Sequence, residues 1–188
     1  DFKNSDEIPT IELFRFLRQR KKWLDGVCIT GGEPTLHKDL PELIRQIKML
    51  GYKIKLDSNG TNPQMLSNLF EQKLLDYVAM DIKTNEDEYA AVVNAMVEIS
   101  NIKTSINLIK NSGIDYEFRT TVVPGLHNEE NFKKMGQWLK GSKQFIIQNF
   151  RPQKCLNRLF EKTKPFSTTQ LQEFKKIMEQ FVENVFVR

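Results

Sequence analysis

The chain has 188 residues, a net charge of +4 and 39% hydrophobic residues, a composition typical of one globular domain with a sizeable core. The basic residues form no stripe interleaved with aromatic residues, and no apolar run is long enough to cross a bilayer, so we expect no nucleic-acid partner and no membrane. There is no signal peptide, and the two cysteines, Cys28 and Cys155, form no CxxC pair. These features predict a single domain over residues 1–188 in a reducing cytoplasm.

Helical and strand patterns alternate along the chain. A first helix is predicted to begin with Thr10 as its cap, and strands are predicted to start near residues 26, 53, 77, 116 and 144. Each strand is followed by a helical pattern. Asn62 and Asn128 are predicted to begin two of the helices, and a loose helical region is predicted from Glu86 to about Ile99. Val185–Val187 reads as a closing edge strand. Repeated βα units predict parallel strands with helices outside, but five units fall short of the eight of a closed barrel. We therefore predict an α/β fold, a partial (β/α) barrel of the TIM type, with an open doubly wound sheet as the alternative.

The turn that follows the first predicted strand is the main candidate for a binding site. It reads Gly31–Gly32–Glu33–Pro34, where the glycines let a ligand approach the backbone closely. Pro34 biases Glu33 toward an extended conformation, which holds a carboxylate at the carboxyl end of a strand. Cys28, within the apolar strand itself, is predicted to be a buried thiol. The alternative is a plain strand-to-helix loop with a solvated glutamate.

Polar side chains follow the other predicted strands as well. At the carboxyl ends they are Asp57, Ser58 and Asn59 for the second strand, Asp81 and Lys83 for the third, which is predicted to run from Tyr77 to Lys83, and Gln148 and Asn149 for the fifth; Arg119 lies within the fourth. Taken singly, Asp57 fits an ordinary turn, and Asp81 with Lys83 fits a local ion pair. Because the carboxyl ends of parallel strands meet at one edge of a sheet, the set predicts a polar site for a zwitterionic, ribose-bearing ligand.

Four segments resemble motifs of the radical S-adenosylmethionine (SAM) enzymes that install glycyl radicals. They are Ile29–Thr35, Lys55–Gly60, Met80–Lys83 and Arg119–Gly125, and their order and spacing match over nearly the whole chain. The resemblance is greatest to the activating protein of anaerobic ribonucleoside-triphosphate reductase, followed by the pyruvate formate-lyase activating enzymes. It implies the partial barrel of the radical SAM family and an enzyme that cleaves SAM by reduction to generate a glycyl radical on a partner.

The resemblance implies roles for residues of the first two motifs. Gly31, Gly32 and Glu33 correspond to the residues that hold the amino group of SAM, with the glutamate accepting charge-assisted hydrogen bonds. Asp57 and Ser58 correspond to residues that contact the ligand or a nearby monovalent cation.

The other two motifs carry the remaining predicted contacts. Asp81 and Lys83 correspond to residues that line the cofactor and the arriving peptide, and Arg119 to the basic residue near the methionine carboxylate or the ribose. The resemblance assigns no catalytic residue and no metal ligand to this chain.

One departure from the family concerns the cluster. Radical SAM enzymes bind a [4Fe–4S] cluster through Cys-x3-Cys-x2-Cys ahead of the first helix predicted here, because thiolates stabilise the cluster iron. This sequence contains no such triplet, and Cys28 and Cys155 are too far apart to replace it. The chain begins at Asp1 without a methionine. We therefore expect that the N-terminal, cluster-binding segment is missing and that this fragment is inactive; the alternative is natural loss of the cluster loop.

The implied partners are a glycyl radical enzyme, of the anaerobic ribonucleotide reductase or pyruvate formate-lyase type, and an electron donor such as flavodoxin or ferredoxin. Two other functions stay open. One is a non-catalytic module that binds SAM or a nucleotide, and the other is a radical SAM enzyme that acts on a small molecule. The sequence gives neither the identity of the partner nor the oligomeric state.

Overall fold

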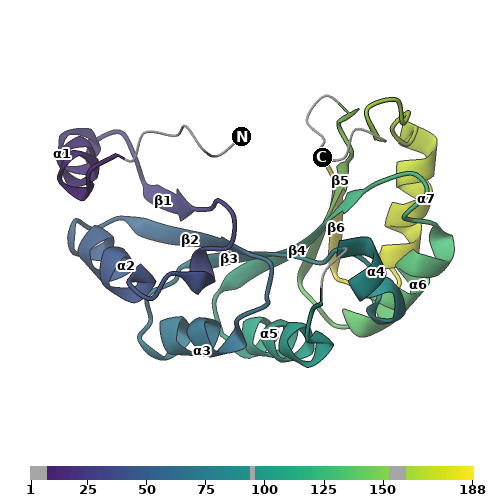
Figure 1. Cartoon of the computed structure of the whole chain (residues 1–188), viewed down its shortest axis with the longest axis horizontal. Helices are drawn as coiled ribbons and strands as arrows, with labels where there is room; N and C mark the ends of the chain where they lie inside the picture. The colour runs from purple at the N-terminus through teal and green to yellow at the C-terminus, as the bar shows by residue number, and fades with distance from the viewer. Residues whose placement is uncertain (1–7, 94–95, 153–159) are drawn as a thin grey trace.

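The fold is a single sheet of six parallel strands in the order β1 to β6, as seen in a computed structural model that describes residues 8–93, 96–152 and 160–188 (Figure 1). The strands are β1 (Gly26–Ile29), β2 (Lys53–Ser58), β3 (Tyr77–Asp81), β4 (Asp115–Val122), β5 (Gln144–Asn149) and β6 (Asn184–Val187). The helices are α1 (Thr10–Arg20), α2 (Leu40–Met49), α3 (Pro63–Glu71), α4 (Tyr89–Val93), α5 (Ile99–Asn111), α6 (Glu129–Trp138) and α7 (Thr168–Met178), with short 3-10 turns η2 (Pro34–Leu36) and η3 (Glu86–Glu88). Every neighbouring pair of strands is parallel, and β1 and β6 are the two edges. The predicted α/β partial barrel is confirmed, and its sheet is not closed.

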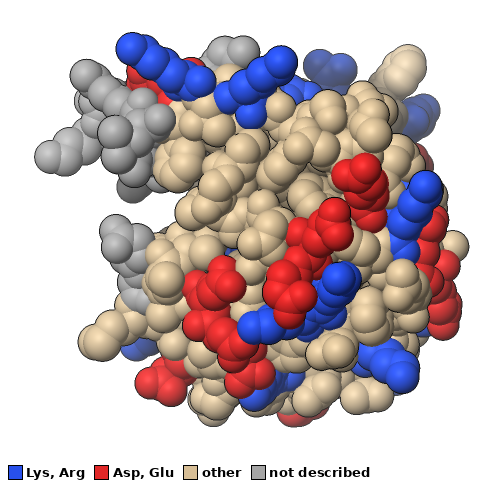
Figure 2. Space-filling model, turned by 90° about the vertical axis from the view of Figure 1, so that its right-hand side faces the viewer, with Lys and Arg blue, Asp and Glu red and all other residues tan. Residues whose placement is uncertain are grey.

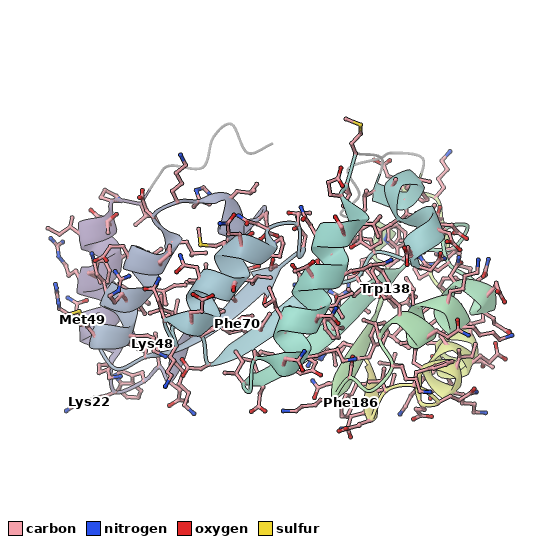
Figure 3. All side chains as sticks on the ribbon, turned by 90° about the horizontal axis from the view of Figure 1, so that it is seen from below. Lys22, Lys48, Met49, Phe70, Trp138 and Phe186 are labelled. Carbon is pink, nitrogen blue, oxygen red and sulfur yellow. The ribbon has the colours of Figure 1, made fainter. Side chains whose placement is uncertain are left out.

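The helices α2, α3, α5, α6 and α7 cover one face of the sheet, while α1 lies beside β1 at the edge (Figure 1). From the helical side, α3 and α5 lie next to each other in front of the strands (Figure 3). Strand alternation explains the burial: Ile54 and Leu56 of β2 face the helices and are fully buried. Lys55 and Asp57 point to the other face, which no helix of the described residues covers. We call this second face of the strands the uncovered face.

Side-chain caps begin several helices where the sequence indicates them. Asn62 Oδ1 accepts a hydrogen bond from Met65 N at 3.1 Å, and Asn128 forms a capping box with Asn131 at the start of α6. The prediction for Thr10 is wrong: Pro9 is the N-cap residue and no side chain caps α1. Thr10 is the first residue of the helix itself, one position past the cap.

Element boundaries differ from the predictions at two places. The third strand ends at Asp81 rather than Lys83, so Lys83 belongs to the turn after it. The region from residue 86, predicted as a loose helix, contains η3 and α4, and α5 begins at Ile99. The closing edge strand is confirmed as β6. None of the described helices has the length and apolarity needed to cross a membrane.

The prediction that Cys28 is buried is wrong. Val27 and Ile29 pack against the core, so alternation turns Cys28 to the uncovered face, where it is exposed. Cys155 lies outside the described residues.

Candidate functional site

The Glu33 carboxylate is turned into the protein and joins the turn after β1 to the end of β2. Its Oε1 accepts hydrogen bonds from Thr35 N at 3.1 Å, Thr35 Oγ1 at 2.5 Å and Ser58 Oγ at 2.9 Å. Its Oε2 accepts one from Asn59 N at 2.6 Å. A carboxylate oxygen has two lone pairs, so Oε2 retains capacity for one further donor. Glu33 is 9% exposed, and it sets the shape of the turn whether or not it touches a ligand.

The backbone of the glycine turn is open to solvent. Gly31 has a φ of +146°, which L side chains rarely adopt, and no atom lies within 4 Å of the position of a Cβ there. A ligand can therefore approach the backbone at Gly31.

Five charged side chains form a chain of ion pairs on the uncovered face. Arg119 on β4 lies between two carboxylates, bonding Asp81 through Nε and Asp57 through NH2, the latter at 3.1 Å. Lys55 pairs with Asp57, and Lys83 Nζ lies 2.8 Å from Asp81 Oδ2. The register aligns Asp81 with Arg119 directly, because β3 and β4 are paired at these residues. Three cations against two carboxylates leave one excess positive charge in the network.

The pairing keeps the network ionised at neutral pH. Burial by itself would raise the pKa of Asp81, but the ammonium of Lys83 and the guanidinium of Arg119 lower that pKa below its ordinary value. The pKa of Asp57 is likewise lowered, since Lys55 and Arg119 outweigh burial. Burial would lower the pKa of Arg119, and the two aspartates raise it instead. All three groups therefore carry charge when a ligand arrives.

The charged network and the glycine turn enclose one cavity of about 210 Å³. Its lining residues are Thr30, Gly31, Gly32, Asp57, Ser58, Asn59, Asp81, Lys83 and Arg119. Of the residues that the resemblance assigns to the site, only Glu33 is missing from this set; it lines, with Gly31 and Gly32, an adjacent cavity of about 560 Å³. Pockets for whole cofactors are larger, about 300–1,000 Å³, so the cavity has the size for one polar end of a ligand and the rest would lie on the uncovered face.

The fifth strand does not contribute to this cavity. Gln148 and Asn149, which the strand-end pattern grouped with the other polar residues, line a separate hollow of about 370 Å³ with Thr121 and Arg188. The predicted polar edge of the sheet is therefore divided between two hollows.

A second polar cluster on the uncovered face was not predicted. The Oε2 atom of Glu117 accepts from Tyr77 Oη at 3.2 Å, Gln144 Nε2 at 3.2 Å and Arg188 NH2 at 3.3 Å. Burial and the adjacent Glu117 carboxylate raise the pKa of Tyr77 to about 12. The sequence places Glu117 among alternating polar residues of a strand, but its partners lie on other strands and give no local signal.

The chemical groups that line the site determine which cofactor they can bind. Opposite charges around a small cavity suit the ammonium and carboxylate groups of an amino acid, as in the methionine end of SAM. An iron–sulfur cluster needs several thiolates. Over residues 8–93, 96–152 and 160–188, no three His, Cys, Asp or Glu side chains group so as to hold a metal ion, and the full sequence has two cysteines. The described residues therefore fit SAM and not a cluster.

Comparison with known proteins identifies the family. A profile of the Radical SAM superfamily matches residues 1–139, which is most of the chain. The chain belongs to this superfamily. The family name implies SAM and an iron–sulfur cluster as cofactors.

Two sequence relatives of this radical SAM protein differ in activity. A glycyl-radical enzyme activating enzyme of Methanocaldococcus jannaschii is 35% identical over 169 residues, covering 87% of this chain and 70% of the relative. A GTP 3′,8-cyclase of Pyrococcus horikoshii is 25% identical over 109 residues, covering 58% of this chain and 35% of the relative. Both names mark the activity as provisional. The chain spans only part of each relative's length.

Solved structures share the fold of this radical SAM protein. A domain of the pyruvate-formate lyase-activating enzyme from Bacteroides vulgatus superposes with a TM-score of 0.69 at 16% identity, over 87% of this chain and 98% of that one. SuiB of Streptococcus suis, bound to S-adenosylmethionine, superposes with a TM-score of 0.73 at 16% identity, over 99% of this chain and 45% of that one. At these identities the likeness establishes the fold.

Proposed function

We propose that this chain supplies the SAM-binding part of a radical SAM enzyme that activates a glycyl radical enzyme. The observation that carries the proposal is the cavity at the carboxyl ends of β2 and β3, where Arg119 from within β4 joins Asp57 to Asp81 beside the open glycine turn. The M. jannaschii relative at 35% identity supports the choice of activity.

The charges of the cavity match the two ends of a bound amino acid. The carboxylates of Asp57 and Asp81 would attract an ammonium group, and the remaining lone pair on Glu33 Oε2 would accept one hydrogen bond from it. The guanidinium of Arg119 and the ammonium of Lys83 would attract the methionine carboxylate or the ribose hydroxyls. Ser58 directs its hydroxyl hydrogen to Glu33, so it would fix the glutamate more than touch the ligand.

The cofactor, when bound and reduced, supplies the group that abstracts hydrogen from a glycine of the partner. We assign the partner to the anaerobic ribonucleotide reductase or pyruvate formate-lyase type, with a [4Fe–4S] cluster and a flavodoxin or ferredoxin as the source of the electron. This chain's own residues bind and orient SAM.

Radical formation tests the proposal. The gene would be expressed without oxygen, together with any coding sequence that precedes residue 1, and reconstituted with iron, sulfide and SAM. Mixing with anaerobic ribonucleotide reductase or pyruvate formate-lyase should give a glycyl radical detectable by electron paramagnetic resonance, and Arg119→Gln should reduce its yield. Cleavage of SAM with no radical on either partner would contradict the activase assignment.

The cyclase relative favours a second candidate, a radical SAM enzyme that acts on a small molecule. In that case the same preparation should cleave SAM only when the small substrate, for instance GTP, is added. A third candidate is a SAM- or nucleotide-binding module without catalysis. Such a module would bind SAM and never cleave it.

A further inference from the structure

The turn that carries Lys83 is fixed through its backbone. Ile82 N donates to Arg119 O at 2.8 Å, and Ile82 O accepts from Thr120 Oγ1 at 2.7 Å. Lys83 N lies 3.4 Å from the hydroxyl of Tyr89. These contacts involve three of the four backbone N–H and C=O groups of Ile82 and Lys83. The fourth is the Lys83 carbonyl.

A buried histidine contacts that carbonyl. His127, in the loop after β4, is 6% exposed, and its Nε2 lies 2.8 Å from Lys83 O. A carbonyl oxygen only accepts, so Nε2 carries the hydrogen. At the other side of the ring, Val123 N–H donates to Nδ1 at 3.1 Å, which requires a lone pair on Nδ1. The two contacts together select the neutral, Nε2-protonated tautomer.

The surroundings oppose a second proton on the ring. A proton on Nδ1 would face the Val123 N–H. The Val123 carbonyl, 3.4 Å from Nδ1, already accepts from the backbone N–H groups of Leu126 and His127, so its lone pairs are in use. The charged side chain that faces His127 is Glu88 of η3, whose carboxylate accepts from Asn131 Nδ2 at 2.9 Å.

We infer that His127 is a positioning residue, whose neutral imidazole ties the Lys83 carbonyl to the loop after β4 and thereby holds the Lys83 ammonium beside Asp81 in the SAM cavity. The inference rests on the proposed function, since it names how one residue of the proposed SAM site is kept in place. The next two residues, Thr84 and Asn85, are at most 1% exposed, and the donor that the structure shows for the Lys83 carbonyl is the buried His127. Loss of this donor would remove that hydrogen bond and let Lys83 move.

The bond from His127 to the Lys83 carbonyl does not depend on the charge of the ring. Burial lowers the pKa of His127 below its ordinary 6.5, which agrees with the neutral tautomer that the contacts require. As the pH falls through that lowered pKa, the ring gains a second proton at Nδ1 and the Val123 contact is lost, but Nε2 still donates to Lys83 O. Protonation of His127 should therefore leave SAM affinity unchanged on the acid side of 6.5.

Two variants separate the two contacts of the ring. His127→Gln places an amide nitrogen where Nε2 lies and keeps a donor for Lys83 O, but loses the acceptor for Val123 N–H. His127→Asn places an amide oxygen where Nδ1 lies and keeps that acceptor, but loses the donor. We expect His127→Asn to weaken SAM binding by about tenfold and His127→Gln to stay close to the wild type over the whole pH range. SAM binding to the full chain is measured by calorimetry from pH 5 to 8, and the imidazole tautomer by ¹⁵N NMR.

The outcomes distinguish the inference from the proposed function. If the wild-type protein does not bind SAM but NMR shows the Nε2-protonated tautomer, the proposed function is refuted. The hydrogen bond between His127 and the Lys83 carbonyl would still stand. Equal SAM affinity for wild type, Gln and Asn would refute the inference and leave the proposed function standing. The Nδ1-protonated tautomer would also refute the inference. If the His127→Asn variant does not fold, hydrogen exchange at the Thr84 amide still tests the inference. Faster exchange in His127→Gln than in the wild type would contradict it.

Discussion

At the residue scale, Arg119 is the group that allows two partly buried carboxylates to share one cavity. The side chains of Asp57 and Asp81 are 14% and 29% exposed, and that of Arg119 17%. Removing one member of such a network leaves charge that water solvates poorly. Arg119 therefore serves the fold as well as the ligand.

We expect Arg119→Met to lower the free energy of unfolding by about 2 kcal/mol at pH 7, because each aspartate keeps one lysine partner but loses the guanidinium. Urea denaturation measures the change. Lys134→Met is the matched control, since it breaks an exposed pair with Asp87 and should leave the midpoint unchanged. Equal effects of the two substitutions would show that the Arg119 network does not contribute to stability.

Acid should weaken this network selectively. Asp57 and Asp81 have folded-state pKa values below the ordinary 3.8, so their contribution is complete above 3.8 and is lost as the pH falls through the lowered values. The stability of the wild type should therefore fall more steeply below 3.8 than that of Asp57→Asn/Asp81→Asn. Urea midpoints between pH 6 and 3 give both curves. Parallel curves would contradict the lowered pKa values.

Residues at strand ends could be predicted from the sequence, and residues whose partners are remote could not. Asp57, Asp81 and Lys83 follow from the rule that parallel strands bring their carboxyl ends together. Arg119, within β4, meets them because the register pairs it with Asp81. The inward turn of the Glu33 carboxylate does not follow from it, because Ser58 and Asn59 approach Glu33 only after β1 and β2 pair. A charged residue at a strand end can be predicted to lie near the site. The direction of its side chain depends on which strands pair beside it.

At the element scale, the turn from β2 to α3 depends on a glycine with little room around it. Gly60 has a φ of +77°, and a Cβ there would lie 1.9 Å from Met80 Cε. The same turn positions Ser58 and Asn59 in the cavity. The element therefore couples core packing to the site.

We expect Gly60→Ala to destabilise the protein by about 2–4 kcal/mol, from the positive φ together with displacement of the buried Met80. Gly113→Ala is the matched control, with the same φ of +77° and no atom within 4 Å of the added Cβ. It should cost about 1 kcal/mol, so the difference measures the steric part. Thermal or urea unfolding of both variants is the measurement. Equal losses would mean that Met80 moves aside freely.

Helix starts were predictable where one side chain reaches back to its own backbone, as at Asn62 and Asn128. The predicted helix start was wrong at α1, where Pro9 is the N-cap residue. The predicted helix from residue 86 was wrong because a short 3-10 turn, η3, stands there first. Local patterns fix an element's presence better than its first residue.

At the scale of the whole molecule, the open sheet has one covered and one uncovered face. Helices cover the first (Figure 1), while the second carries the partly buried charged network and the exposed Cys28. On the side formed by α4, α6 and α7, acidic and basic side chains are interspersed (Figure 2). The parallel order of the strands was predictable from the regular spacing of the βα units. The exposure of Cys28 was not, because it depends on what covers the uncovered face, and the spacing of the units carries no information on that.

We expect Cys28 to react with a thiol reagent in the native state. Burial and the neighbouring Asp57 raise the pKa of its thiol above 9.0, so at pH 8 the reaction should be slower than that of free cysteine and should accelerate as the pH rises. The measurement is mass spectrometry of Cys155→Ser treated with a maleimide, with Cys28→Ser/Cys155→Ser as the unlabelled control. Labelling only after denaturant is added would show that the second face is covered.

The central claim is that the cavity between the glycine turn and the Arg119 network binds the methionine end of SAM, and calorimetric titration with SAM tests it most directly. The account predicts binding by the wild-type chain, competition by methionine, and loss of at least about tenfold in affinity in Glu33→Ala and in Arg119→Gln, with Lys134→Met unchanged. Affinity that is the same in all four proteins, or binding that adenosine displaces and methionine does not, would contradict it.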